Sequence, residues 1–571
     1  MDTTIAPPSH TRTDPPGHPG DAVLAYHLAT SHRFDRYARG PETLDWDAQP
    51  AAFRSYPGSP ARPLPLIDDL LDGRTDDPLR AALQRPFDAL STSPPVPVTI
   101  ASLGALLQLA CGLTAWKTLG PDRWALRANP SSGNLHPVEC WLVSEGIDPL
   151  SDGVHHYRPE DHALELRASD RQAAGASRLH IALSTAMWRE AWKYGERAFR
   201  YCQLDVGHTV GALRYAAAVL GWTLHSESGV DGASLATRLG LDRHADYPAR
   251  REAATEREEA ELVLALGAPG LVAGADPVRW RDRAASADWH GRASELDPRP
   301  FYRWPAVDAI ARATRPPAAP PEAPKPSAPP PGRQRRREAG AVELILGRRS
   351  AQRYDAGFVM PRKSLVRLIN ALMRRGAPPA DALPASTELD LLLIIHRVRG
   401  IEPGVYLLPR ASDDGLRQHL AQRHPRLLLP GPIAGSPLRC LATLAPARLA
   451  EIARRLHCHQ AIAADACLAI AFVAPLEQGL SGHPERYRTL HRAAGLLGQQ
   501  LYLEAGAEGL AGTGIGCFFD GPVRQFHGLD DSPWHTVYHF AIGMALHDQR
   551  IGTEPAYGAD RLARFSQEDT P

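Results

Sequence analysis

Two long stretches of the sequence place apolar residues at the spacing of a buried helix. Residues 196–222 read ERAFRYCQLDVGHTVGALRYAAAVLGW, and residues 485–510 read ERYRTLHRAAGLLGQQLYLEAGAEGL. Both are rich in Ala and Leu and both end near a glycine, as a helix with a glycine C-cap does. They therefore predict two similar long helices. Aligning them superposes Arg200 on Arg488, Gly207 on Gly495 and Gly221 on Gly509.

A second pattern, upstream of each long helix, predicts paired strands. A polar turn leads into an apolar run in NPSSGNLHPVECWLV (129–143) and again in LPASTELDLLLII (383–395). GVHHY (153–157) follows the first run and GVYLL (404–408) follows the second. The same elements in the same order predict a tandem duplication, in which each half is an α+β layer of long helices on a mixed sheet.

A proline-rich stretch separates the two halves. Residues 316–331 contain nine prolines in sixteen residues, a density that removes backbone donors and fixes φ, so we expect an extended linker over 314–337. It divides the chain into residues 21–313 and 338–571. Residues 1–20 have the composition of a disordered lead.

Composition narrows the classes of function. Lys and Arg total 64, as do Asp and Glu, so the formal net charge is zero and neither a nucleic-acid partner nor a charged membrane surface is expected. The chain shows no signal pattern and no apolar run long enough to span a bilayer. Seven scattered cysteines do not predict a disulfide framework. These features predict a cytoplasmic protein.

Four short motifs resemble known flavin-binding elements. The sequences PSSGNLHP (130–137), GRRSAQRYD (347–355) and GTGIGCFFD (512–520) are similar to elements of the nitroreductase superfamily. Within it, KYGERAFRY (193–201) resembles the SagB/ThcOx-type dehydrogenases, some of which oxidise azoline rings in modified peptides. The resemblance covers most of both halves and leaves out the lead and the linker.

The resemblance implies a fold and a cofactor. Proteins of this superfamily are homodimers with two FMN sites, each built from both subunits. Here it implies two nitroreductase-like α/β sandwich halves that form a pseudo-dimer within one chain. The second half keeps the arginine-serine and Gly-x-Gly elements, whereas residues 29–37, taken as their counterpart, lack the double arginine. The first half keeps the Pro-Ser-Ser turn, whereas residues 384–390 lack its glycine and asparagine. We therefore expect one FMN site, shared between the halves.

Residues at this site are carried over by motif. The turn supplies Pro130, Ser131, Ser132 and Asn134; the second half supplies Arg348, Arg349, Ser350, Gly514, Ile515, Gly516 and Arg550. Guanidinium and hydroxyl groups suit a phosphate, and glycines allow backbone N–H groups to approach the flavin edge. Arg349 and Arg550 could instead be charges on the protein surface. The turn could instead be an ordinary turn, because Pro, Ser, Gly and Asn are common turn residues.

The same resemblance places Lys193 and Tyr194 as catalytic residues. A partly desolvated lysine beside a flavin has a lowered pKa and serves as a base. The alternative is a helix entry with a snorkelling lysine. No metal site is expected, because His457, Cys458 and His459 on one short segment do not supply four ligands.

Three functions remain open from the sequence. The first is an FMN-dependent oxidoreductase that dehydrogenates a peptide or small heterocycle by hydride transfer to flavin N5. The second is an NAD(P)H-dependent nitro or quinone reductase. The third is a non-catalytic flavin-binding scaffold within a biosynthetic complex. The sequence leaves open whether two chains associate further.

Overall fold

The computed structural model describes residues 19–72, 77–172, 175–249, 253–317, 339–411, 413–558 and 561–562. The predicted lead lies outside these ranges except for its last two residues, which already belong to the first helix, α1 (Pro19–Ala29). Residues 318–337 of the predicted linker also lie outside them.

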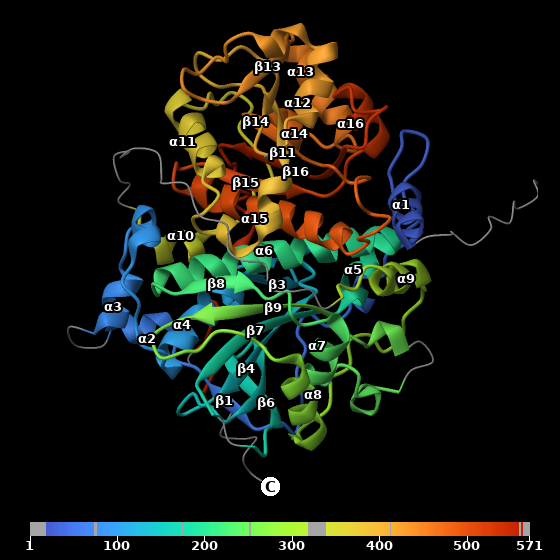
Figure 1. The fold of residues 1–571 in the computed structure, drawn as a ribbon. Helices are drawn as coiled ribbons and strands as arrows, with labels where there is room; N and C mark the ends of the chain where they lie inside the picture. Colours follow the sequence, from blue (N-terminus) through green and yellow to red (C-terminus); the bar gives the residue numbers. More distant parts are fainter. Residues whose placement is uncertain are drawn as a thin grey trace, which may run out of the picture.

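Each half of the chain contains one large sheet (Figure 1). The first is eight-stranded in the order β1-β6-β5-β4-β7-β9-β8, with β10 also paired to β6. The second is six-stranded in the order β13-β12-β11-β14-β16-β15. The strands of the first sheet are β1 (Ala61–Pro63), β4 (Val138–Glu145), β5 (Gly153–Arg158), β6 (Ala163–Ser169), β7 (Arg178–Thr185), β8 (Thr223–Ser226), β9 (Glu259–Gly267) and β10 (Asp288–Trp289). Those of the second are β11 (Asp390–Ile395), β12 (Gly404–Leu408), β13 (Arg439–Thr443), β14 (Leu468–Ala474), β15 (Ala511–Ile515) and β16 (His535–Gly543).

The two sheets share one strand order. In space, β6-β5-β4-β7-β9-β8 corresponds to β13-β12-β11-β14-β16-β15, and the strands follow one another along the chain in the same sequence. The predicted apolar runs are confirmed as neighbouring strands, since Leu142 pairs with His155 and Leu392 with Leu407. The expectation of a mixed sheet is wrong, because every ladder between these strands is antiparallel. Neighbouring strands β4, β5 and β6 follow one another by short loops, which suit antiparallel pairing.

The two predicted long helices are α6 (Ala198–Val219) and α15 (Arg486–Gly506). They pack against each other in the centre of the molecule, between the two sheets (Figure 1). A Cβ atom added to Gly207 would lie 2.0 Å from the carbonyl oxygen of Arg492, and one added to Gly495 would lie 2.0 Å from that of Leu204. The aligned glycines therefore mark the crossing point, where the two backbones touch.

Buried ion pairs join the halves across these helices. Asp520 of the second half accepts from Arg197 at 2.9 Å and from Arg200 at 2.7 Å. Glu261 of the first half accepts from Arg488 at 2.7 Å and also pairs with Arg492. Each of these side chains is at most 8% exposed. The interface between the halves therefore combines apolar packing with compensated buried charge.

Two short helices make matching contacts with the aligned arginines. Thr30, which follows α1, accepts at 3.1 Å from Nε of Arg200; Thr314, which follows α9 (Pro305–Ala313), accepts at 2.9 Å from Nε of Arg488. The residue after α1 and the residue after α9 thus contact the aligned arginines in the same way. The two segments therefore occupy equivalent positions in the two halves. The sequence comparison that set residues 29–37 against 347–355 is therefore wrong, because it aligned short similar strings rather than equivalent positions. Of the two comparisons that predict a single site, only that of the turns then remains.

A small sheet ties the end of the chain to the first half. It has the order β17-β2-β3, in which β17 (Gly552–Glu554) pairs with β2 (Leu113–Leu119), and β2 with β3 (Asp122–Arg127). The remaining α-helices are α2 (Ile67–Asp72), α3 (Pro78–Leu83), α4 (Ile100–Cys111), α5 (Met187–Tyr194), α7 (Gly232–Leu239), α8 (Pro277–Ser286), α10 (Ala341–Gly347), α11 (Arg362–Met373), α12 (Gly415–Arg423), α13 (Pro446–Leu456), α14 (Ile462–Asp465) and α16 (Asp520–Phe526).

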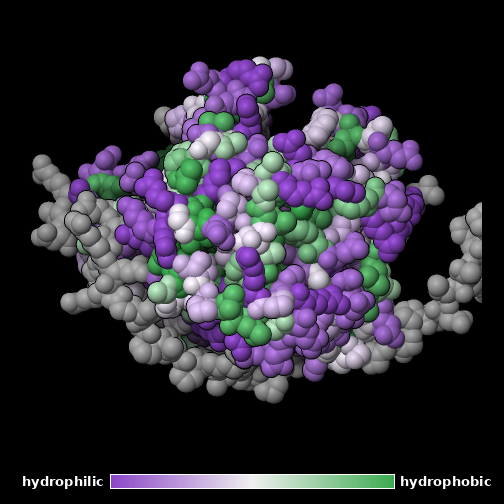
Figure 2. Space-filling model, turned by 90° about the horizontal axis from the view of Figure 1, so that it is seen from above, coloured by the Kyte–Doolittle hydropathy of each residue, from purple (hydrophilic) through white to green (hydrophobic). Residues whose placement is uncertain are grey.

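The outer face of the second half is mostly hydrophilic, with apolar side chains gathered near its centre in Figure 2. Within the described ranges, no helix combines the length and the hydrophobicity needed to cross a bilayer.

Candidate functional site

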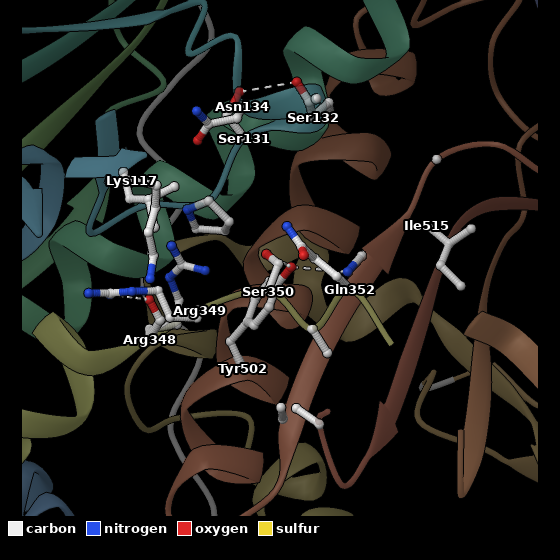
Figure 3. A pocket seen from close by; sticks show the side chains of 18 of the residues that line it. Lys117, Ser131, Ser132, Asn134, Arg348, Arg349, Ser350, Gln352, Tyr502 and Ile515 are labelled. Carbon is white, nitrogen blue, oxygen red and sulfur yellow. Dashed lines mark hydrogen bonds between the residues drawn. The ribbon is translucent and has the colours of Figure 1, made fainter. Parts of the chain in front are cut away.

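A cavity of about 840 Å³ lies between the two halves. Figure 3 shows the turn residues Ser131, Ser132 and Asn134 on one side of it, and Arg348, Arg349 and Ser350 on the other. The predicted residues that line it are Pro130, Ser131, Ser132, Asn134, Tyr194, Arg348, Arg349, Ser350, Gly514, Ile515 and Gly516. The structure thus brings together residues that lie more than two hundred positions apart in sequence.

The two serines of the turn are held by a buried aspartate of α6. Asp205 accepts from Oγ of Ser131 at 2.6 Å, from Oγ of Ser132 at 3.0 Å and from the backbone N–H of Ser132 at 3.1 Å. Burial raises the pKa of Asp205 to about 7 despite these hydrogen bonds. Asp205 itself lines the cavity. The hydroxyls therefore position the turn on α6 in addition to facing the cavity.

The backbone of the turn is unusual. Gly133, Asn134 and His136 have φ values of 60°, 61° and 51°. A Cβ at Gly133 would lie 2.5 Å from the hydroxyl of Tyr194 and 3.0 Å from Nζ of Lys193. The glycine is therefore required both by its φ and by the close approach of α5. The Asn134 side chain stabilises the bend: its amide donates to the Ala125 carbonyl at 2.9 Å, and its oxygen contacts Nε2 of His136 at 3.0 Å.

Arg348 belongs to the second half and binds the first half through two of its three guanidinium nitrogens. Its Nε donates to the carbonyl of Ala128 at 2.9 Å, and its Nη2 donates to that of Arg127 at 3.0 Å. Its Nη1 is buried and has no hydrogen-bond partner among the described residues. Burial lowers the pKa of Arg348 to about 10. A buried guanidinium nitrogen without a partner is costly, and an anionic ligand in the cavity would supply one.

Two further cations stand beside Arg348. Arg349 donates to Oγ1 of Thr114 at 3.2 Å, and Lys117 of β2 donates to Oγ1 of Thr553 at 2.5 Å. Burial lowers the pKa of both, and Arg349 further lowers that of Lys117. Within the described part of the chain, none of these three cations forms a salt bridge with a carboxylate. This end of the cavity is therefore an uncompensated positive site.

Tyr502 of α15 organises the cavity wall beside Arg348 and Ser350. Its hydroxyl lies 2.8 Å from Oγ of Ser350 and accepts at 3.0 Å from the N–H of Gly514. A Cβ at Gly514 would lie 1.8 Å from the hydroxyl of Tyr538, and one at Gly516 would lie 2.1 Å from Cε1 of Tyr201. Because Gly514 and Gly516 lack a Cβ atom, the side chains of Tyr538 and Tyr201 can pack directly against their backbone in the cavity wall. The N–H of Gly514, expected to face a ligand, is engaged by Tyr502.

The predicted catalytic pair lies at the end of α5, where Tyr194 is among the residues that line the cavity and Lys193 is not. Lys193 brings its Nζ against the turn at Gly133. Burial lowers the pKa of Lys193, while Glu190 opposes that shift. Burial raises the pKa of Tyr194 well above its ordinary value. Lys193 also packs on the ring of Trp46, with Nζ 5.1 Å from its centroid. A lowered lysine pKa suits a general base.

Arg550 is not placed as the sequence predicts. Its side chain is 79% exposed and pairs with Asp548 at 2.6 Å, and it is not among the residues that line the cavity. Both carboxyl oxygens of Asp548, two residues away, accept from the guanidinium of Arg550 and hold it outside the cavity. Lys117, which has no motif around it, occupies the positive end of the cavity instead.

Several lining residues carry no recognisable sequence signal. Asp205 and His208 lie in the pattern of a long helix, where a polar residue ordinarily indicates a solvent-facing position; both are buried. His208 Nε2 contacts the hydroxyl of Tyr538 at 2.9 Å. Elsewhere, His457 pairs with His539 at 2.7 Å, and no group of three metal-binding side chains gathers within the described ranges.

Comparison with solved structures places the fold. A crystal structure described as that of a putative nitroreductase from Anabaena variabilis aligns over 92% of this chain and 99% of its own, with a TM-score of 0.63 and 21% identity. The likeness extends over both halves and shows a shared fold. The E. coli microcin synthetase complex McbBCD aligns over 29% of this chain and 62% of its own at 19% identity, with a TM-score of 0.22, too low to bear on this protein.

Sequence comparison points to the same class. The nitroreductase family model matches residues 345–544, within the second half. A protein of Methanocaldococcus jannaschii named as a putative nitroreductase is 27% identical over 138 residues, which are 22% of this chain and 66% of that protein. The match thus covers slightly less than two thirds of that relative. The fold of the chain is of the nitroreductase type.

Proposed function

We propose that this protein is an FMN-dependent oxidoreductase with one FMN in the cavity between its halves. The observation that carries the proposal is the positive end of that cavity, where, among the described residues, Arg348 has a buried nitrogen without a partner and Lys117 and Arg349 have no carboxylate partner. A phosphate with nearly two negative charges matches three such cations. The family match over residues 345–544 supports a flavin as the molecule that carries it.

The residues present fit this cofactor. Arg348, Arg349 and Lys117 would hold the phosphate, and the turn with Tyr201, Tyr502 and Tyr538 would enclose a flat ring system. The cavity of about 840 Å³ lies within the range of cofactor-sized sites. When bound, FMN would supply hydride acceptance and donation.

The reaction we favour is dehydrogenation of a peptide or small heterocycle, as in SagB/ThcOx-type enzymes. The supporting observation is the position of Lys193 and Tyr194 at the end of α5 beside the turn, where a desolvated lysine removes a proton from the substrate. Reduction of a nitro or quinone compound with NAD(P)H is the second candidate, favoured by the family match. A cytoplasmic location belongs to the same proposal.

We further propose that the chain arose by tandem duplication and is a pseudo-dimer. The shared strand order, the aligned glycines at the helix crossing and the paired contacts of Thr30 and Thr314 support this.

Flavin content tests the proposal. Flavin released from the purified chain by denaturation should equal one FMN per chain, and the bound flavin should be reduced by an electron-donating substrate or by NADH or NADPH. A ratio near two would place a second site in the chain. A colourless protein that takes up no added FMN would refute the function, and flavin that no donor reduces would favour the scaffold alternative.

A further inference from the structure

A chain of buried charged side chains runs from the turn away from the cavity. It begins at Arg189 of α5, whose Nη1 donates to the carbonyl of His136 at 2.8 Å and to Oε1 of Glu139 at 2.5 Å. The other carboxyl oxygen of Glu139 lies 3.2 Å from Nε2 of His156, and Nδ1 of His156 lies 2.8 Å from Oε2 of Glu165. These four charged side chains belong to residues that are at most 1% exposed, so each link of the chain is shielded from water.

Neighbouring strands of the first sheet carry the middle of this charged chain. Glu139 lies on β4, His156 on β5 and Glu165 on β6, and His156 is directly opposite Glu165 in the ladder. Residues opposite each other on neighbouring strands have their side chains on one face, so the sheet fixes their spacing. The rings of Trp141 and Tyr56 enclose His156, with centroids 4.8 Å and 5.1 Å from its own. The charged chain is therefore anchored in the core of the first half.

The signs of the charges alternate along the chain. Burial lowers the pKa of His156, but its hydrogen bonds to Glu139 and Glu165 outweigh burial and raise the pKa to about 9, so the ring is an imidazolium at neutral pH. Burial raises the pKa of Glu139, but Arg189 and His156 bring it down to about 2. Arg158 donates to Glu165 at 3.1 Å at the far end. Because desolvation offsets much of the attraction between buried charges, net stability does not by itself account for this arrangement.

Arg189 connects the charged chain to two features of the cavity wall. The carbonyl that accepts from it belongs to His136, whose Nε2 lies 3.0 Å from the side-chain oxygen of Asn134, and Asn134 lines the cavity. Lys193 follows Arg189 by about one turn of α5 and lies against the turn at Gly133. The turn and α5 therefore meet at two points, and Arg189 makes one of them by a charge-assisted hydrogen bond.

We infer that Arg189 is a positioning residue: held by Glu139 and His156, it sets where the turn and the end of α5 lie in the cavity wall. Arg189 is not among the described residues that line the cavity, so it acts through the turn and α5 and does not touch substrate or cofactor. In catalysis, a role that rests on the proposed function, it would set the distance between Lys193 and a flavin that the turn holds.

Arg189→Lys separates the positioning role from that of charge alone. Lysine keeps the positive charge, but without a planar guanidinium it cannot donate at once to Glu139 and to the carbonyls of His136 and Ala51, as the arginine does. Arg448→Lys, the same change at an exposed ion pair, is the matched control.

Hydrogen exchange in the full chain without added flavin measures the effect. The backbone N–H groups of Asn134 and Leu135 donate to carbonyls of the turn at 3.1 Å and 3.3 Å, so their exchange reports how well the turn is ordered. In Arg189→Lys this exchange should become about tenfold faster, the scale of one lost hydrogen bond to a charged group, while exchange in β7 stays unchanged. Arg448→Lys should change neither. Unchanged exchange at the turn would refute the positioning role. Equally faster exchange in the turn and in β7 would also refute it, because Arg189 would then only stabilise the fold.

NMR of the ¹⁵N-histidine-labelled chain tests the part behind Arg189. His156→Gln assigns the His156 signals among those of the 24 histidines. In the parent both ring nitrogens should stay protonated up to about pH 9, and in Glu139→Gln the midpoint should fall because one of the two carboxylates is gone. Glu139→Gln should also speed exchange at the turn. A His156 midpoint near the ordinary 6.5 in the parent, or parent-like exchange at the turn in Glu139→Gln, would show that Arg189 is not held in this way and overturn the inference.

FMN binding separates this role from the proposed function. Protein that binds no FMN, yet shows the selective change of exchange in Arg189→Lys, would refute the function and keep the positioning role. Protein that binds FMN equally tightly in the parent and in Arg189→Lys, with unchanged exchange at the turn, would keep the function and refute the positioning role.

Discussion

At the scale of single residues, Arg348 joins the structure of the protein to its proposed chemistry. Two of its nitrogens donate to carbonyls of the first half, and the third is buried with no partner in the part of the chain that the structure describes. The same side chain therefore holds the halves together and offers a donor to an anion. Asp205 also serves both structure and site, because it accepts hydrogen bonds from the turn and lines the cavity.

Arg348→Ala should weaken FMN binding by about 1.5–3 kcal/mol, the scale of a charge-assisted hydrogen bond. Riboflavin, which lacks the phosphate, should bind the variant and the parent equally. Fluorescence titration of both ligands measures the difference. Arg550→Ala is the matched control, because that guanidinium lies outside the cavity. Equal FMN affinity in the parent and Arg348→Ala would place the phosphate elsewhere.

Asp205 should make stability depend on pH. Its pKa is about 7 in the folded chain against 3.8 ordinarily, so the folded protein keeps a proton that the unfolded chain loses. The free energy of unfolding should therefore fall as pH rises from about 4 to about 7, by up to about 4 kcal/mol for this group alone at about 1.4 kcal/mol per unit. Denaturant unfolding across this window should show a shallower decline in Asp205→Asn. Parallel curves would contradict the raised pKa.

At the scale of elements, periodicity predicts most of what is observed. Residues 196–222 and 485–510 become α6 and α15, and the apolar runs become β4 and β11. Their mutual arrangement does not follow from local pattern. The pairing of Arg488 with Glu261, more than two hundred residues away, depends on how the halves dock. Lys117 likewise reaches the cavity only because β2 pairs with β17.

The charged contacts between β9 and α15 should be important for stability. Glu261 accepts from Thr185 at 2.6 Å and from Arg488 at 2.7 Å, and it also pairs with Arg492. Glu261→Gln would leave the buried guanidinium of Arg492 without the carboxylate that it pairs with and that of Arg488 with Glu259 alone, at a cost of about 3–5 kcal/mol. Chemical denaturation measures this loss. Glu451→Gln, at an exposed pair, should leave the unfolding midpoint unchanged. If Glu261→Gln and Glu451→Gln unfold at a similar midpoint, water or a rearrangement of side chains replaces the lost ion pairs.

At the scale of the whole molecule, the site is a property of the docked halves. The turn comes from residues before 140 and the arginines from residues after 345, and buried ion pairs join the two halves. A half alone would expose both the apolar and the charged parts of its interface to water.

Fragments ending and beginning within residues 318–338 should each bind FMN poorly. Mixed together, they should recover binding with an affinity that depends on fragment concentration, because the covalent tether no longer sets the effective concentration. Flavin fluorescence quenching during titration of one fragment into the other measures this. Tight binding by the first fragment alone would place the site within residues 21–317, and tight binding by the second would make the turn structural.

The position of β17 has a consequence for how the protein is made. Residues 545–549, 551 and 553 line the cavity, and β17 pairs with β2 far upstream. A ribosome therefore releases the turn hundreds of residues before the wall that completes the pocket. During that interval the first half must persist with its arginines and glutamates unmatched, a state in which larger chains tend to aggregate. Loading of the proposed FMN is thus confined to the time after residue 553 has left the ribosome.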